Sequence, residues 1–318
     1  MSPLPSRVRA FAPASIGNFG PGLDVLGCAV TGAGDTVIAE WCDERGVVLR
    51  DPGHPELPAD PALHTSAIAA AAVLRRALGG GTRAPSPGIA LTVKKELPLS
   101  AGQGGSAASA VAGAVAANAL CGAPLSAEAL LDACLLAEST VAGRHLDNLA
   151  PCLLGGICLV RSMDPIDVVK LPVPDSLFIV LAHPAQRLRT ADARAVLPAS
   201  VDRATALHQA AQVAAIVAAL ASGDLALLGR AIDDRIAEPA RAPLIPGFRA
   251  AKAAALQAGA LGASISGAGP TTFALAGDLA CAQAVAAAME SAFAAQAITS
   301  TVRVCEVDRA GAQVEREA

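Results

Sequence analysis

The pattern of hydrophobic and polar positions in the first half of the chain predicts strands mixed with helices. Residues 7–12 alternate as a half-buried strand does, whereas residues 13–27 carry several Gly and Pro and indicate a loop. Two β-rich runs within 34–50 flank a polar turn and predict a hairpin. The elements predicted next are a helix over 64–78 ended by the glycines at 79–81, a strand over 89–94, and helices over about 106–120 and 126–141.

The second half of the chain shows the same mixture. Apolar runs predict strands over 152–161 and 166–171, and the pattern starts afresh after about residue 165. The elements predicted after that point are strands over 177–182, 263–266, 271–276 and 301–307, and helices over 192–197, 201–222, 226–236, 246–258 and 279–295. Strands mixed with helices, with a hairpin among them, indicate an α+β fold. We therefore predict two closely packed domains, 1–165 and 166–318.

Composition and charge exclude several classes of protein. Hydrophobic residues make up 53% of the 318 positions and charged residues 16%, which excludes intrinsic disorder. The net charge of −4 provides no overall basic field, so we expect no nucleic-acid partner. The eight cysteines contain no C-x-x-C pair, which argues against a zinc ribbon or a thioredoxin-type site.

One charge-free segment bears on the question of a membrane. No charged residue occurs between Glu96 and Glu128, and a run of this length can span a bilayer. Its residues are mostly Ala, Gly and Ser, however, which favours a buried helix in a compact domain. The first residues show no apolar leader segment, so we expect a cytoplasmic protein with no membrane partner.

The strongest local signal for chemistry is a Gly-rich loop between a predicted strand and the long Ala-rich helix. Glycines without a Cβ let backbone N–H groups approach an anion, and a helix N-terminus adds partial positive charge. The hydroxyl of Ser106 can bind a phosphate or a metal; a flexible turn with Ser106 as helix N-cap is the plainer interpretation. This predicted phosphate loop consists of Pro98, Leu99, Ser100, Ala101, Gly102, Gln103, Gly104, Gly105, Ser106, Ala107 and Ala108.

Two other phosphate motifs fit this loop less well. A Walker A loop needs Gly-Lys followed by Ser or Thr, and Gly-Lys occurs nowhere in the chain. The spacing of Gly102, Gly104 and Ala107 matches the loose dinucleotide-binding pattern. That pattern also needs an acidic residue at the end of the next strand, and the nearest candidate, Glu128, lies in a predicted helix.

Four further segments concentrate polar residues in a chain that is poor in charge. Glu138 can offer a hard oxygen to a divalent cation, and His145, Asp147 and Asn148 follow closely. The arginines at 187–194 and at 241 can each donate two hydrogen bonds to a carboxylate or a phosphate. The alternative is an ordinary ion pair, with Asp192 for Arg194 and with Glu238 for Arg241. The turn at 264–270 is Gly-rich but lacks the G-x-S-x-G spacing of a serine esterase.

Taken in order, these segments resemble the motifs of the GHMP small-molecule kinases, and within them the homoserine kinases. The resemblance covers nearly the whole chain. Three segments match motifs of the superfamily: residues 12–24, 98–108 and 264–270. Three more are similar to homoserine kinases in particular: residues 143–151, 190–198 and 238–246.

The resemblance implies a fold and a reaction. The fold is a GHMP kinase fold, with an N-terminal domain like the second domain of ribosomal protein S5 and a ferredoxin-like C-terminal domain. The reaction is transfer of the ATP γ-phosphoryl group to the side-chain hydroxyl of L-homoserine, with Mg²⁺, in threonine biosynthesis. A homodimer is the usual family state. A GHMP kinase for another small alcohol, and a catalytically silent protein of this fold, are the alternatives.

The resemblance also implies roles for single residues of this chain. The loop at 98–108 would hold the ATP phosphates, His64 would lie beside the adenine, and Ser106 with Glu138 would hold Mg²⁺. The predicted substrate residues are Asn18, Asp24, His145, Asn148, Thr190, Arg194, Arg241 and Gly267.

Two positions of the loop depart from the family pattern, and one substrate residue limits the mechanism. Gln103 and Gly105 replace the Leu and the first Ser that relatives carry in the phosphate loop. Asn148 and Asp24 are the predicted catalytic residues. Mevalonate and galactose kinases of the superfamily carry Asp where Asn148 falls, and Asn cannot take a proton. We therefore expect catalysis by positioning and charge stabilisation.

Overall fold

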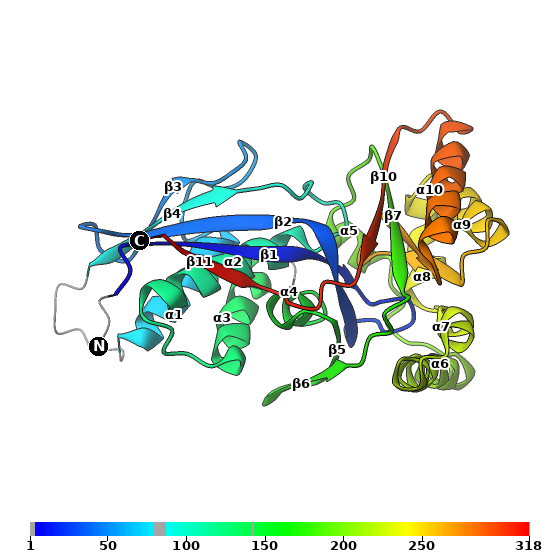
Figure 1. The fold of residues 1–318 in the computed structure, drawn as a ribbon, viewed down its shortest axis with the longest axis horizontal. Coiled ribbons are helices and arrows are strands. Elements are labelled where there is room, and N and C mark those ends of the chain that lie inside the picture. Colours follow the sequence, from blue (N-terminus) through cyan, green and yellow to red (C-terminus); the bar gives the residue numbers. More distant parts are fainter. Residues whose placement is uncertain (1–3, 79–86, 142, 318) are drawn as a thin grey trace.

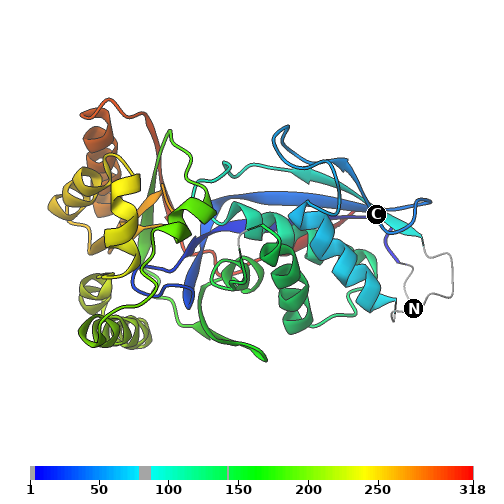
Figure 2. The same cartoon turned by 180° about the vertical axis from the view of Figure 1, so that it is seen from behind.

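The computed structural model describes residues 4–78, 87–141 and 143–317. Its larger sheet has seven strands, and four helices lie on one side of it (Figures 1 and 2). Five strands run in the order β11 (Gln313–Glu317), β1 (Arg7–Gly17), β2 (Leu26–Cys42), β4 (Gly88–Lys94) and β3 (Val47–Asp51). β5 (Ile157–Met163) pairs with β2 and with β6 (Ile166–Leu171). The helices are α1 (Thr65–Ala77), α2 (Gly105–Leu120), α3 (Ala127–Ser139) and α4 (Leu149–Leu154).

The Ala-rich α2 forms the centre of this layer. Every residue from Ala107 to Leu120 is buried, because small side chains let the sheet and the neighbouring helices approach closely. A Cβ at Gly113 would clash with the backbone of Ser66 in α1. The charge-free segment is therefore a core helix, as predicted from its composition.

The second sheet has four antiparallel strands in the order β10 (Ser300–Glu306), β7 (Phe178–Pro184), β9 (Thr272–Ala276) and β8 (Gly262–Ile265). Helices α9 (Phe248–Gln257) and α10 (Leu279–Ala294) pack against it. When these four strands are numbered in chain order, they lie side by side in the order 4-1-3-2, which is the ferredoxin-like arrangement. The elements between β7 and β8 also include α5 (Thr190–Ala195), α6 (Arg203–Ser222), α7 (Leu225–Ala231), α8 (Ala237–Arg241) and the 3₁₀ turn Ala242–Leu244. The predicted α+β fold is confirmed.

Several local predictions were wrong. The hairpin at 34–50 does not form, because β4 lies between β2 and β3 and pairs with β3 in parallel. Much of the predicted loop at 13–27 is strand, since β1 continues to Gly17 and β2 begins at Leu26. The run at 152–161 begins as the end of α4, not as a strand. The glycines at 79–81 lie outside the described residues.

Strands from both ends of the second half return to the first sheet. β6 pairs with β5, and β11 pairs with β1 next to the N-terminus of the described chain. Sequence patterns did not reveal β11. The division at residues 165 and 166 stays a prediction, and these pairings place two strands beyond it in the first sheet.

One helix among the described residues, α6, is long and apolar enough to cross a membrane by length and composition, which is weak evidence on its own. The buried amide of Gln209 on this helix donates to Pro21 O and to the carboxylate of Asp234, both at 3.0 Å. These bonds tie α6 to the rest of the protein.

Candidate active site

A cavity of about 620 Å³ is lined by residues from both halves of the chain, and most of the predicted site residues are among them. The predicted residues that line it are Asn18, His64, Pro98, Leu99, Ser100, Ala101, Gly102, Gly104, Gly105, Ser106, Ala107, Glu138, His145, Asn148, Thr190, Arg194, Arg241 and Gly267. Asp24, Gln103 and Ala108 do not line it. Asp147 and Lys95 also line the cavity, although the sequence did not single them out as site residues.

The phosphate loop has glycines at positions where a side chain would clash with neighbouring residues. Gly104 caps α2 with φ of +68°, and a Cβ there would clash with the hydroxyl of Ser15. A Cβ at Gly102 would lie 2.5 Å from Ser266 O. The first bond of the helix runs from Ala108 N to Gly104 O, so the amides at 105–107 have no acceptor within the helix. Such a helix start provides N–H donors for an anion.

The side chain of Gln103 points away from this cavity. Its amide donates to the hydroxyl of Thr271 at 3.3 Å, and its oxygen accepts from Arg303 at 3.1 Å. Its backbone oxygen accepts from Ser15 N at 3.1 Å. Gln103 therefore fastens the loop to the second sheet, and its side chain is not placed to touch a ligand in the cavity.

Glu138 and Ser106 meet at the start of α2. The hydroxyl of Ser106 donates to Glu138 Oε2 at 2.7 Å, and burial raises the pKa of Glu138 to about 7. The described residues contain no cluster of three or more His, Cys, Asp or Glu that could hold a metal alone. One carboxylate and one hydroxyl fit Mg²⁺, which commonly takes its remaining ligands from water and substrate phosphates.

Asn148 is the N-cap residue of α4, and its side chain lies against β1. Its Oδ1 accepts from the hydroxyl of Ser15 at 2.9 Å. A Cβ at Gly17 would clash with Nδ2 of Asn148, and a Cβ at Gly27 would clash with the backbone of Asp147. Gly17 and Gly27 fall in the predicted loop at 13–27, but in the structure they make room for the 147–148 segment, which lies directly on β1 and β2.

Asp147 is the acidic residue that the sequence did not assign. It is 3% exposed, and its carboxylate accepts from Asn18 N at 3.0 Å. This bond holds Asn18 in a left-handed conformation with φ of +66°, from which its amide donates to Gly267 O at 3.1 Å. Burial, followed by repulsion from Asp24, raises the pKa of Asp147 to about 6. Asp147 thus fixes Asn18 of the 12–24 segment, and Asn18 in turn bonds the 264–270 segment.

Asp24 lies in an ion pair at the edge of the cavity. Arg194 donates two hydrogen bonds to the carboxylate of Asp24, at 2.6 and 3.3 Å, and His145 Nδ1 lies 3.4 Å from Asp24 Oδ1. The nearest acid in sequence, Asp192, pairs with Arg189 instead. The local ion pair that the sequence offered for Arg194 is therefore wrong.

Arg241 differs from Arg194, because its partners are carbonyl groups. It is 2% exposed, with Nε donating to Ala193 O at 3.1 Å and Nη1 to Gly267 O at 2.8 Å. Glu238, the acid close by in sequence, binds Lys252 and Ser264 instead. Among the described residues, no carboxylate lies within ion-pair distance of this guanidinium. Burial, and then repulsion from Arg194, lowers its pKa, so an anion in the cavity would stabilise its charge.

His64 and Thr190 lie on the walls of the cavity. His64 is buried, and its ring bonds with Pro52 O at 3.2 Å and the hydroxyl of Ser66 at 2.8 Å. Burial lowers its pKa, which favours a neutral ring. Thr190 begins α5, one turn before Arg194.

Comparisons with known proteins agree with this geometry. The family descriptions "GHMP kinases N terminal domain" and "GHMP kinases C terminal" match residues 65–156 and 216–295. A homoserine kinase of Chlorobaculum tepidum is 42% identical over 96% of this chain and 98% of its own. A homoserine kinase of Arabidopsis thaliana is 39% identical over 86% of this chain and 75% of its own.

A solved structure extends the likeness to three dimensions. The crystal structure of a homoserine kinase from Cytophaga hutchinsonii superimposes with a TM-score of 0.92 at 42% identity, covering 99% of both chains. Identity at this level over nearly full length exceeds what a shared fold alone requires. The chain therefore belongs to the homoserine kinase family within the GHMP kinases.

Proposed function

We propose that this chain transfers the γ-phosphoryl group of ATP to the side-chain hydroxyl of L-homoserine, giving O-phospho-L-homoserine in threonine biosynthesis. The observation that carries the proposal is Arg241, a buried cation that faces the cavity without a carboxylate partner among the described residues. The carboxylate of an amino acid supplies the missing charge. The names of the curated relatives support the same substrate.

Asp24 and Arg194 complete the recognition of a zwitterion. The α-ammonium group of homoserine is a partner for Asp24, and the α-carboxylate is a partner for Arg194 as well as for Arg241. A bound amino acid can therefore replace both halves of the present Asp24–Arg194 pair at once. An alcohol that has only one of the two charges would break the pair and leave the other ion without its partner, which is costly in a partly buried site.

The nucleotide phosphates would lie on the amides at the start of α2, with His64 beside the base. Glu138 and Ser106 would hold Mg²⁺, and a bound Mg²⁺ neutralises charge on the phosphate oxygens. Glu138 must be ionised for this role, and a nearby cation would lower its raised pKa.

The hydroxyl end of the substrate would meet Asn148. Ser15 donates to Asn148 Oδ1 and so leaves the Nδ2 hydrogens for a ligand. The amide can orient the attacking oxygen but cannot remove its proton. Phosphoryl transfer has little need of a strong base, and a phosphate oxygen can take the proton. Positioning and charge stabilisation then account for the rate.

The purified chain is tested with ATP and a panel of alcohols that includes homoserine, threonine, mevalonate and galactose, with ADP release as the signal. Homoserine is expected to give the highest kcat/KM. Faster turnover of another alcohol favours a different GHMP kinase, and ATP binding without turnover favours a silent binding protein. We also propose a cytoplasmic homodimer, which light scattering tests against the 31.5 kDa mass of one chain.

A further inference from the structure

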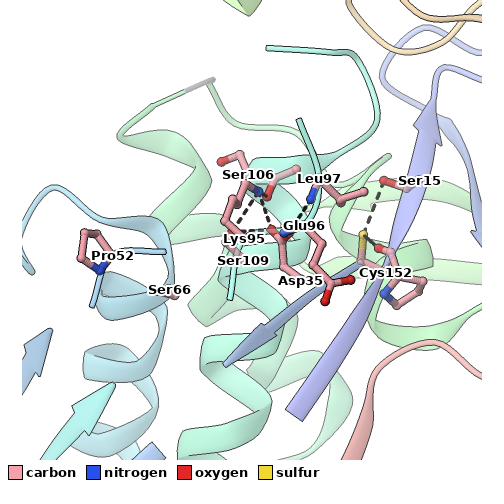
Figure 3. A network of polar contacts seen from close by, with 12 residues as sticks. Ser15, Asp35, Pro52, Ser66, Lys95, Glu96, Leu97, Ser106, Ser109 and Cys152 are labelled. Carbon is pink, nitrogen blue, oxygen red and sulfur yellow. Dashed lines mark hydrogen bonds and ion pairs between the residues drawn. The ribbon is translucent and has the colours of Figure 1, made fainter. Parts of the chain in front are cut away.

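A buried lysine lies directly beneath the phosphate loop, and the roles proposed so far do not use it. The side chain of Lys95 is 4% exposed. Its ammonium group contacts the carboxylate of Asp35, the backbone oxygen of Gly105 at 2.6 Å and the hydroxyl of Ser109 at 3.2 Å (Figure 3). These three acceptors match the three N–H donors of an ammonium group. Lys95 therefore has no donor left for a phosphate.

Asp35 is as fully engaged as its partner. Its side chain is completely buried, and it accepts from the hydroxyl of Ser109 at 2.6 Å and from the backbone amides of Glu96 and Leu97 at 3.1 Å. The pair thus joins β2, the chain entering the phosphate loop and the first turns of α2. A buried ion pair with all its hydrogen bonds satisfied fixes the elements that it joins.

The contact with Gly105 is the one that bears on a ligand. Gly105 is the first residue of α2, and the next amide is that of Ser106, which lines the cavity. A trans peptide is planar, so its C=O and N–H point in opposite directions. Holding Gly105 O on the ammonium group therefore directs the Ser106 N–H away from Lys95. A cation on the carbonyl also polarises the peptide and strengthens that N–H as a donor.

Gly105 leaves room for this arrangement. A Cβ at position 105 would lie 2.9 Å from Lys95 Nζ, which is closer than real Cβ contacts come. Position 105 is also where the family pattern has Ser instead of Gly. In this chain the ammonium group occupies space that a side chain at position 105 would need.

We propose that Lys95, neutralised by Asp35, is a positioning residue for the nucleotide phosphates, acting through the Gly105–Ser106 peptide and not by touching the phosphate. The inference rests on the proposed function in one respect, that the loop at 98–108 binds the phosphates of ATP. If the inference is right, the affinity for the nucleotide phosphates depends on Lys95, a side chain outside the loop. The affinities for the base and for homoserine do not depend on it.

The test uses a variant that removes the charge without leaving an ion behind. Lys95→Met alone would bury an unpaired Asp35, so it is combined with Asp35→Asn, whose oxygen can still accept from the 96–97 amides. The matched control is Lys94→Met, which changes the neighbouring exposed lysine. Steady-state kinetics give KM for ATP, KM for homoserine and kcat, and calorimetry gives the affinities for ATP and for adenosine, which has the base but no phosphate.

The double variant is expected to bind ATP about 10- to 100-fold more weakly, with a matching rise in KM for ATP. Its affinity for adenosine and its KM for homoserine stay within about twofold of wild type. Lys94→Met changes none of these values. Unchanged ATP affinity in a folded double variant overturns the inference, and so does an equal loss for adenosine and ATP.

A second variant covers the case in which the double variant does not fold. Lys95→Arg keeps a cation beside Asp35, but its planar guanidinium cannot reproduce the three-acceptor geometry. Weaker binding of ATP with unchanged binding of adenosine supports the inference, and unchanged binding of both contradicts it. A wild-type chain that binds ATP but leaves homoserine unphosphorylated would contradict the proposed function instead, and the comparison of ATP with adenosine would still stand.

Discussion

Replacing Arg241 with Leu should separate recognition of the substrate carboxylate from a purely structural role. The Nε–H and one Nη–H of Arg241 bind Ala193 O and Gly267 O, which leaves the other N–H groups for a ligand. A hydrogen bond to a charged group contributes about 1.5–3 kcal/mol, and about 1.4 kcal/mol corresponds to tenfold. Loss of a two-bond contact with a buried carboxylate therefore predicts a fall in kcat/KM for homoserine on the order of 10²-fold or more.

The assay compares two substrates within the same variant. Homoserine and its carboxyl ester are tested by ADP release with wild type, with Arg241→Leu and with the control Arg249→Leu, an exposed arginine on α9. The ester lacks the negative charge, so its kcat/KM should fall by less than about tenfold in Arg241→Leu. Arg249→Leu should behave as wild type does. An equal loss for acid and ester would show that Arg241 only holds Ala193 and Gly267 in place.

Three further predictions concern the nucleotide side of the cavity. Glu138→Gln should leave the fold intact and lower kcat by on the order of 10²–10³-fold. The reason is that it removes an anionic ligand of Mg²⁺ that contributes about 3–4 kcal/mol to stabilising the transition state. Near-normal turnover at saturating Mg²⁺ would exclude this role. Gly104→Val should abolish ATP binding in calorimetry, because a side chain at φ of +68° strains the loop and its Cβ would clash with the hydroxyl of Ser15. Unchanged ATP affinity would refute the role of the loop at 98–108 in binding the phosphates. The pKa values of Glu138 and Asp147 are raised to about 7 and about 6, so the folded protein keeps these two protons to a higher pH than the unfolded chain does. The stability that the two groups contribute is therefore full below pH 4 and is lost as pH rises to about 7. Unfolding in denaturant without Mg²⁺ or nucleotide should show a loss of up to about 3 kcal/mol from each group, and Glu138→Gln should remove its share. An equally steep loss in that variant would contradict the assignment.

Much of the architecture could be predicted from periodicity, but strand order could not. The helix at 106–120 and the strand at 89–94 lie within one residue of the observed α2 and β4. Alternation shows which residues form a strand, not which strand it pairs with. The adjacent runs in 34–50 suggested a hairpin, whereas β4, about 40 residues further on, takes the place between them.

The site shows the same limit at the level of single residues. The phosphate loop and Glu138 could be found because glycines and lone charges stand out in a charge-poor chain. Partners could not be found, because they are distant in sequence: Arg194 pairs with Asp24, 170 residues away, and Lys95 with Asp35, 60 residues away. Asp147 carried no signal beyond its polar neighbours, and its burial became evident only in the fold.

The most direct test of the central claim is the identity of the product. The purified chain is incubated with ATP, Mg²⁺ and L-homoserine, and the phosphorus-containing products are followed by ³¹P NMR. A phosphomonoester signal that splits by coupling to the side-chain methylene protons, formed in step with ADP, is the predicted result. Release of ADP with inorganic phosphate alone, or no reaction with homoserine while another alcohol is phosphorylated, would contradict the assignment of this cavity as a homoserine kinase active site.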